Sequence, residues 1–285
     1  MAGRAPAAGS PSGEPITIFA DHRMQSMNFD FKRPLDRQLA ELKDAIRAKP
    51  QDAPLRVFYF QVLAVYGEWQ KALDQLQICA QLDRKAEAMA RAYREVILCE
   101  VARRDVFAGK RTPNIVGEPP EWLGWMVEGL QCLAEGRAGQ AAELRAAAFE
   151  QAPASAGEID GEAFEWIADS DARLGPVCEL YANGSYYWVP FSSVSQIAFE
   201  KPQDLRDLVW SACELTLHNG GVMHGFIPTR YPGSETAERD EIRLARATEW
   251  RDLGDDQATG WGQRVWATDQ GDAALLDVRR VKLSA

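Results

Sequence analysis

Apolar residues recur every three or four positions from Leu35 onward, which is the spacing of amphipathic helices. The segment 35–48 places four of them on one stripe, at Leu35, Leu39, Leu42 and Ile46. Segments 54–83 and 121–153 are each predicted to form two apolar helices separated by a short turn. The stretch 86–109 is also helical in pattern, but it matches the two-helix pattern of the neighbouring segments poorly. This half of the chain is therefore predicted to be helical throughout.

The two predicted helix pairs are copies of one plan, because each is broken at a glycine and Gly67 and Gly136 lie 69 residues apart. This displacement is about twice the 34-residue length of a tetratricopeptide repeat. Pro50 and Pro153 then fall at the closing position of such a repeat. A glycine at the turn allows a positive φ, which a Cβ atom would strain. We therefore predict a tetratricopeptide-like helical domain over 34–155.

In this repeat frame, six side chains face the concave surface of the helical domain. They are Val57, Gln61 and Ala64 in one unit and Met126, Leu130 and Leu133 in another. A largely apolar concave face suits a groove that receives an amphipathic helix of a partner protein. The alternative is that some of these residues pack against the second half of the chain. The aromatic residues beside the helix-packing positions are predicted to be core: Tyr59, Phe60 and Trp69.

After residue 155 the pattern changes to short runs rich in β-branched and aromatic residues. The run VCELYANGSYYWVP predicts a hairpin around Asn183-Gly184, a dipeptide favoured in type I′ turns because both residues take positive φ. A second hairpin is predicted around Asn219-Gly220. The fold class is therefore α+β, with the helical domain followed by a compact, mainly antiparallel β-rich domain over 156–285.

Composition narrows the classes of function. A formal net charge of −10 disfavours nucleic acid binding, because phosphate contacts require clustered Lys and Arg. The five cysteines are widely spread and include no CxxC pair, so neither a disulfide framework nor a zinc ribbon is indicated. We expect reduced, mostly buried thiols. No run of about 18 apolar residues predicts a membrane span.

The first residues are small and Pro-rich, and they lack the apolar stretch of a signal peptide. Residues 1–33 are therefore predicted to form a disordered tail. A start codon assigned too far upstream would explain such a tail, since Met24 and Met27 lie where organised sequence begins.

Acidic residues gather at one place in the chain: Asp160, Glu162, Glu165, Asp169 and Asp171. A metal site needs carboxylates or imidazoles that converge in a fixed geometry. This run contains no histidine, and we interpret its acids as spread around a helix and its end, where they cap the helix or face solvent.

The remaining candidates for chemistry are few. His22 lies in the predicted tail, and His218 and His224 flank the second hairpin turn. The chain has no GxSxG and no HExxH motif. Arg230 and Tyr231 in PTRYPGS could form an anion pocket, although a turn held by its own arginine explains them as well. A metal- or anion-dependent enzyme that uses the acidic run or the Arg230 turn is therefore the alternative hypothesis.

Several segments, taken in order, carry a family resemblance: AIRAKPQDAPLRVFYFQVLAVYGEWQKALDQL, GEPPEWLGWMVEGL, EIDGEAFEWIADSDARLGP, YYWVPFSSV, LRDLVW and IPTRYPGSE. Together they resemble the ImpE family, also called SciE-type virulence proteins. The resemblance runs from about Leu35 to the C-terminus and leaves residues 1–33 outside. The short N-terminal helix that is usual in the family is replaced here by FDFKRPL.

The resemblance implies a cytoplasmic, non-enzymatic accessory protein of the bacterial type VI secretion system. Family members are associated with the contractile sheath. They bind a helix of its small subunit and influence recycling of the sheath by the ClpV unfoldase. On this basis we expect neither a metal nor a cofactor, and no membrane or nucleic acid partner. The segments GSYYWVPF and IPTRYPGS are then chiefly structural or interface elements.

Overall fold

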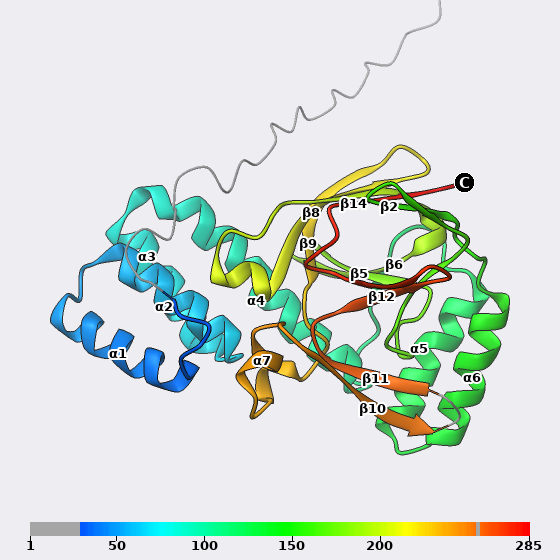
Figure 1. The fold of residues 1–285 in the computed structure, drawn as a ribbon, viewed down its shortest axis with the longest axis horizontal. Helices are drawn as coiled ribbons and strands as arrows, with labels where there is room; N and C mark the ends of the chain where they lie inside the picture. Colours follow the sequence, from blue (N-terminus) through cyan, green and yellow to red (C-terminus); the bar gives the residue numbers. More distant parts are fainter. Residues whose placement is uncertain (1–28, 255–256) are drawn as a thin grey trace, which may run out of the picture.

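The computed structural model describes residues 29–254 and 257–285. Helices come first along the chain, and a mainly antiparallel β-rich part follows (Figure 1). The predicted α+β class is therefore confirmed. The helices before the β-rich part are α1 (Leu35–Ala48), α2 (Ala53–Val65), α3 (Trp69–Leu82), α4 (Glu87–Phe107), α5 (Glu121–Ala134) and α6 (Ala138–Gln151).

The two predicted helix pairs are α2 with α3 and α5 with α6. Their turns contain Gly67 at φ +68° and Gly136 at φ +77°, so both glycines take the positive φ that was predicted. The poorly matching stretch between the pairs is a short 3₁₀ turn, Arg84–Ala86, followed by the single 21-residue helix α4.

The helix pairs lie at opposite ends of the molecule. In Figure 1, α1–α3 stand at the left, α5 and α6 stand at the lower right, and α4 runs diagonally between them along the sheet. The pairs are therefore held in place by α4 and by the β-rich part rather than by stacking on each other.

The strands are β1 (Asn114–Ile115), β2 (Gly157–Ile159), β3 (Glu162–Phe164), β4 (Ile167–Asp169), β5 (Val177–Ala182), β6 (Ser185–Pro190), β7 (Val194–Phe199), β8 (Trp210–Leu217), β9 (Val222–Pro228), β10 (Thr248–Gly254), β11 (Gln257–Gly262), β12 (Val265–Thr268), β13 (Gly271–Ala274) and β14 (Arg280–Leu283). Nine of them form the main sheet in the order β1-β6-β5-β9-β8-β7-β14-β2-β3. A smaller sheet has the order β13-β12-β4, and β10 pairs with β11. Of these named strand pairs, β1 with β6 is parallel and the others are antiparallel.

Both predicted hairpins are present. Between β5 and β6, Asn183 has φ 50° and Gly184 has φ 68°, as a type I′ turn requires. Strands β8 and β9 are joined by the longer loop 218–221, in which Gly220 has a positive φ of 83°.

One hydrophobic core runs through the helical and the β-rich parts. It joins Leu42 and Phe60 of the helices with Trp188, Trp210 and Phe226 of the strands. A second core fills the space between the other face of the main sheet and the small sheet. The two parts thus share apolar packing across residue 155, where the sequence predicted a domain boundary.

Two local expectations need correction. Phe29 packs edge-on against Phe58 at a centroid distance of 6.2 Å, and Gln38 hydrogen-bonds the backbone of Asp30. Residues 29–33 therefore fold onto the helices, while residues 1–28 of the predicted tail, with Met24, Met27 and His22, lie outside the described part. The acidic run was expected on a helix, but it forms β3 and β4 and the turns beside them.

Candidate functional site

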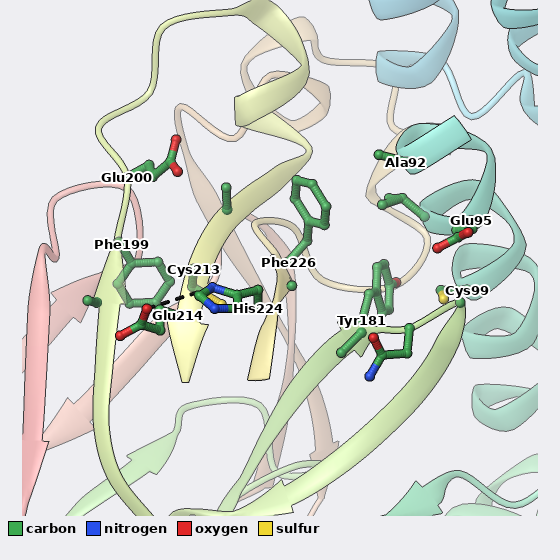
Figure 2. Close-up of a pocket in the computed structure, with 17 residues that line it drawn as sticks. Ala92, Glu95, Cys99, Tyr181, Phe199, Glu200, Cys213, Glu214, His224 and Phe226 are labelled. Atoms are coloured by element: carbon green, nitrogen blue, oxygen red, sulfur yellow. Dashed lines mark ion pairs between the residues drawn. The ribbon is translucent and has the colours of Figure 1, made fainter. Parts of the chain in front are cut away.

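A groove of about 450 Å³ lies between helix α4 and one face of the main sheet (Figure 2). One wall is the middle part of α4, which contributes Ala92, Glu95, Val96 and Cys99. The floor and the opposite wall come from strands β7, β8 and β9 and from the β5–β6 turn. We call this feature the α4–sheet groove.

The floor of the groove is built from residues that lie side by side on neighbouring strands. Ala198 of β7 is paired with Glu214 of β8, and Glu214 is paired with His224 of β9. In the next row Ala212 is paired with Phe226. Directly paired residues project from the same face of a sheet, so these side chains share the face toward α4. The alanines leave room above the sheet that larger side chains would fill.

Phe226 closes the inner end of the floor. Its ring packs on Tyr93 of α4 at a centroid distance of 5.4 Å, and both belong to the shared core. Tyr181 of β5 is paired with Phe226 and also lines the groove. The floor thus continues the hydrophobic core, with Phe226 8% exposed and Ala198 and Ala212 partly exposed.

Three carboxylates line the groove. Glu95 stands on α4, whereas Glu200 and Glu214 stand on the strand side (Figure 2). Glu214 Oε2 lies 3.7 Å from Nδ1 of His224. Within the described residues neither Glu95 nor Glu200 belongs to an ion pair, and the described lining contains no Lys or Arg. Burial, and then the nearby Asp207, raise the pKa of Glu200.

The six residues that were predicted to face a partner lie elsewhere. Five of them are buried and the sixth is half-buried: Val57, Gln61, Ala64, Met126 and Leu130, then Leu133. On α2, Gln61 Oε1 accepts a hydrogen bond from the backbone N of Arg206 at 3.4 Å, because the 3₁₀ turn Leu205–Leu208 packs on this helix. On α5, Met126 belongs to the shared core. The expected open concave face is therefore corrected, since the rest of the chain covers it.

The acids of the run at 160–171 do not converge. Asp160 accepts hydrogen bonds from the backbone N atoms of Arg279 and Arg280, and Glu162 and Glu165 are exposed. Asp169 and Asp171 are buried, and each forms an ion pair with an arginine, Arg264 and Arg173 respectively. The described residues contain no group of three or more His, Cys, Asp or Glu side chains placed to hold a metal ion.

The Arg230 turn is a junction between the two parts of the chain. Arg230 is 4% exposed, and its guanidinium donates to the carbonyls of Val65 at 2.8 Å and Ala64 at 3.3 Å. It also donates to the carbonyl of Arg243 at 2.6 Å. A cation suits the C-terminal end of α2, where helix carbonyls lack partners and the dipole is negative. Three backbone carbonyls therefore hold the guanidinium in place.

The second aromatic segment is packed in the same junction. Tyr231 Oη donates to the Val265 carbonyl at 3.0 Å and accepts from the Val265 N at 2.9 Å. A Cβ at Gly260 would lie 2.1 Å from the Tyr231 ring, so the ring needs a glycine there. The structural interpretation of IPTRYPGS is thus consistent with its contacts.

A buried charge network was missed by the sequence analysis. Glu179 of β5 accepts from Arg103 of α4 at 2.7 and 2.8 Å, from Arg264, and from Tyr186 Oη at 2.5 Å. Burial opposes ionisation, but the guanidinium groups of Arg103 and Arg264 outweigh it and lower the pKa of Glu179 to about 2. Burial raises the pKa of Asp169, the other partner of Arg264, to about 6. Two cations and two acids from distant segments thus satisfy one another inside the core, and no local motif signals them.

A second hollow, of about 660 Å³, lies where α6 meets β4 and the β10–β11 hairpin. Three of the seven large hydrophobic residues that are exposed in the described part surround it: Phe149, Trp166 and Trp250. This aromatic hollow shares no lining residue with the α4–sheet groove. None of the helices in the described part combines the length and the apolarity needed to cross a bilayer.

Comparison with known proteins agrees with the sequence resemblance. The model of the ImpE protein family matches residues 161–282. The chain is 45% identical over 249 residues to the type VI secretion system accessory component TagJ of Pseudomonas aeruginosa, which covers 87% of this chain and 86% of that protein. The crystal structure of protein VPA1032 from Vibrio parahaemolyticus has a TM-score of 0.80 at 26% identity and covers 88% of this chain and 94% of that chain. On this shared sequence and fold, the chain belongs to the ImpE family.

Proposed function

We propose that this protein is a non-enzymatic accessory component of a bacterial type VI secretion system and works in the cytoplasm as an adaptor. Its similarity to TagJ over most of both chains supports the accessory role. The groups of the alternative enzyme hypothesis have structural partners: Arg230 donates to backbone carbonyls, and Asp169 and Asp171 form ion pairs with other arginines. That hypothesis gains no support from their geometry.

The adaptor binds a helix of the small sheath subunit and thereby influences ClpV-dependent recycling of the sheath. The observation that carries this proposal is the α4–sheet groove, whose apolar floor lies open beside a long helix. A helix packs most readily on an existing helix and sheet face when small residues let the backbones approach. Ala92, Ala198 and Ala212 provide such residues on both sides of the groove.

Capture of the sheath subunit tests the proposed function. The purified protein is immobilised and offered the small subunit of the same secretion system in three forms: intact, without its N-terminal helix, and with the sequence of that helix scrambled. We expect capture of the intact form alone. Equal capture of all three forms would exclude recognition of the helix, and capture of none would exclude the sheath subunit as the partner.

The effect on recycling is measured separately. Assembled sheaths are incubated with ClpV and ATP, with and without this protein, and disassembly is followed by light scattering. We expect the rate of disassembly to change when the protein is added. An unchanged rate, with capture intact, would limit the function to binding.

The enzyme hypothesis has a simple test of its own. Protein purified without chelators is assayed for bound metal by mass spectrometry, because a catalytic metal site retains stoichiometric metal. We expect less than about one tenth of an equivalent of any transition metal. A stoichiometric ion lost on changing Asp169 or Asp171 would support the alternative.

A further inference from the structure

The α4–sheet groove combines two properties that restrict its occupant. Its floor carries apolar side chains that continue the core, while Glu95 and Glu200 at the borders and Glu214 on the floor add three carboxylates, without a lysine or arginine in the described lining. An occupant that covered the floor with apolar groups alone would leave these carboxylates partly desolvated and unpaired, which is unfavourable. The occupant must therefore bring positive charge together with an apolar surface.

We infer that the α4–sheet groove recognises a cationic amphipathic helix whose Lys or Arg side chains flank a narrow apolar stripe. This inference rests on the proposed function, because it states which kind of helix the adaptor accepts. Apolar side chains at i, i+3 or i+4 spacing would enter above the alanines of the floor.

The positions of the acids set the arrangement of the cations. Glu95 stands on the α4 wall, and Glu200 and Glu214 stand on the opposite, strand side (Figure 2). Cationic side chains are therefore needed on both sides of the apolar stripe. A helix with all its basic residues on one side would pair with one wall only.

The surroundings of the carboxylates favour cationic partners. Glu200 is an exposed residue just after β7, and partial burial of its carboxylate together with Asp207 raises its pKa, so a cation beside it relieves an unfavourable charge. Among the residues that the structure describes, Glu214 forms one ion pair, with His224 at 3.7 Å. Both side chains are about half exposed, so a lysine or arginine can join or replace the imidazole. The formal net charge of −10 adds long-range attraction for a basic partner.

Other occupants fit less well. A polyamine would satisfy the carboxylates and leave the apolar floor uncovered, and a nucleic acid would be repelled by the acidic borders. The aromatic hollow beside α6 is the competing surface for an apolar helix, because its rim is formed by Phe149, Trp166 and Trp250.

The test uses two designed helical peptides besides the sheath subunit. Both carry the same apolar stripe of Leu, and the flanking positions are Lys in one and Glu in the other. Binding to the full-length protein is measured by fluorescence anisotropy at low and at raised salt. We expect the Leu/Lys peptide to bind at least tenfold more tightly than the Leu/Glu peptide, and its affinity to fall with salt. Equal binding of the two peptides would overturn the inference.

A triple variant locates the contact. Glu95→Gln, Glu200→Gln and Glu214→Gln together should weaken binding of the Leu/Lys peptide about tenfold, since each partly exposed ion pair contributes a small factor. The matched control removes three exposed acids from α5 and α6, with the same change in net charge: Glu128→Gln, Glu143→Gln and Glu150→Gln. We expect the control to lose less than about twofold in affinity. Equal losses in the two triple variants would show that only net charge matters, and would overturn the inference.

A variant that fills the groove tests the location of binding without changing any charge. Ala92→Trp fills the groove from the exposed side of α4, and Ala147→Trp places the same bulk on a half-exposed position of α6. Only the first should abolish peptide binding, while circular dichroism shows both to be folded. Binding lost instead with Trp166→Ser and Trp250→Ser would place the partner in the aromatic hollow and would refute the assignment to the groove.

The two levels of the proposal fail differently. If the sheath subunit is not captured but the Leu/Lys peptide binds in the groove, the proposed function is wrong and the inference about ligand chemistry survives. If the sheath subunit is captured and the triple glutamine variant captures it equally well, the proposed function survives and the inference is wrong.

Discussion

Gly67 and Gly136 occupy equivalent turns, yet the structure predicts that alanine will affect them differently. Both take positive φ, so a Cβ brings similar backbone strain at each site. At Gly136 an added Cβ meets no atom within 4 Å. At Gly67 it would lie 2.5 Å from Cγ and 2.9 Å from Cβ of Glu235, which belongs to the β-rich part. Alanine at position 67 therefore adds a clash between the two parts of the chain to the backbone strain that both sites share.

The expected magnitudes follow from these contacts. Gly136→Ala should lower the free energy of unfolding by about 1 kcal/mol, the cost of placing a non-glycine residue at positive φ. Gly67→Ala should lose that amount and about 1–3 kcal/mol more, because Glu235 or its backbone has to move. The Cβ of Glu235 is fixed by its backbone and cannot turn away, and its Cγ can move only if χ1 changes.

Urea unfolding followed by circular dichroism measures both losses, with the m-value as a check that each variant still unfolds in two states. A double-mutant cycle isolates the clash. In the background of Glu235→Gly, the atoms that meet the new Cβ are gone, so Gly67→Ala should cost only about 1 kcal/mol. Gly136→Ala should cost the same in either background.

The reasoning is refuted if the two alanine variants lose the same stability and the cycle shows no coupling between positions 67 and 235. The turn of the first helix pair would then not pack against the segment that contains Glu235, and the docking of the helices on the β-rich part would be wrong.

Four further predictions address the core and its charges. Gln61→Glu with Met126→Glu, a pair that an open concave face would tolerate, should instead cost several kcal/mol, because both positions are buried; a melting temperature within about 2 °C of wild type would contradict this. Trp69→Ala should cost about 2–4 kcal/mol in urea unfolding, because its ring packs on Trp210 of the shared core. Arg230→Met should cost about 2–5 kcal/mol, since it leaves the carbonyls at the end of α2 without their buried donor; Arg230→Lys should recover less than half of the loss. Stability is also expected to fall in acid.

The expected loss of stability in acid follows from Glu179. Its pKa in the folded protein is about 2, below the ordinary value of 4.5. Its ionised form therefore stabilises the protein above pH 4.5, and this contribution of about 3 kcal/mol is lost as the pH falls from 4.5 toward 2. The stability gap between wild type and Glu179→Gln should narrow over that range in urea titrations. A gap that stays constant from pH 5 to pH 2 would show that Glu179 is not ionised in the folded core.

The features predicted correctly from sequence were those with a local physical cause. The glycines of the helix pairs were found because a tight turn needs positive φ and the two copies repeat at a fixed distance. The hairpin at Asn183-Gly184 was found because few residue pairs accept the type I′ conformation. The order of helices before strands followed from the change in apolar periodicity near residue 155.

The features predicted wrongly depend on contacts between distant segments. The repeat frame placed Gln61 on an open face, but the turn that covers it lies about 145 residues later, beyond any repeat-length pattern. The acidic run was interpreted as helical, although Ile167–Asp169 is a strand whose partner, β12, comes about a hundred residues further on. Arg103 and Glu179 gave no local signal, because Arg103 is one of several charged residues of α4 and Glu179 is a single acid in an apolar strand 76 residues away. The α4–sheet groove was missed because its floor is assembled by cross-strand pairing.

The contact between Leu35 and Asp240 has a consequence for the order of events during synthesis. The backbone N of Leu35, the first residue of the first helix, donates to the Asp240 carboxylate at 2.8 Å across 205 residues. The helices emerge from the ribosome first, yet much of the apolar surface they bury is supplied by strands made later. At roughly 5–20 residues per second, the early helices wait about 10–40 s before their final neighbours exist. Nascent chains that stop before residue 230 should therefore expose apolar helix surface and bind chaperones, and release should come abruptly once the Arg230 junction has left the exit tunnel.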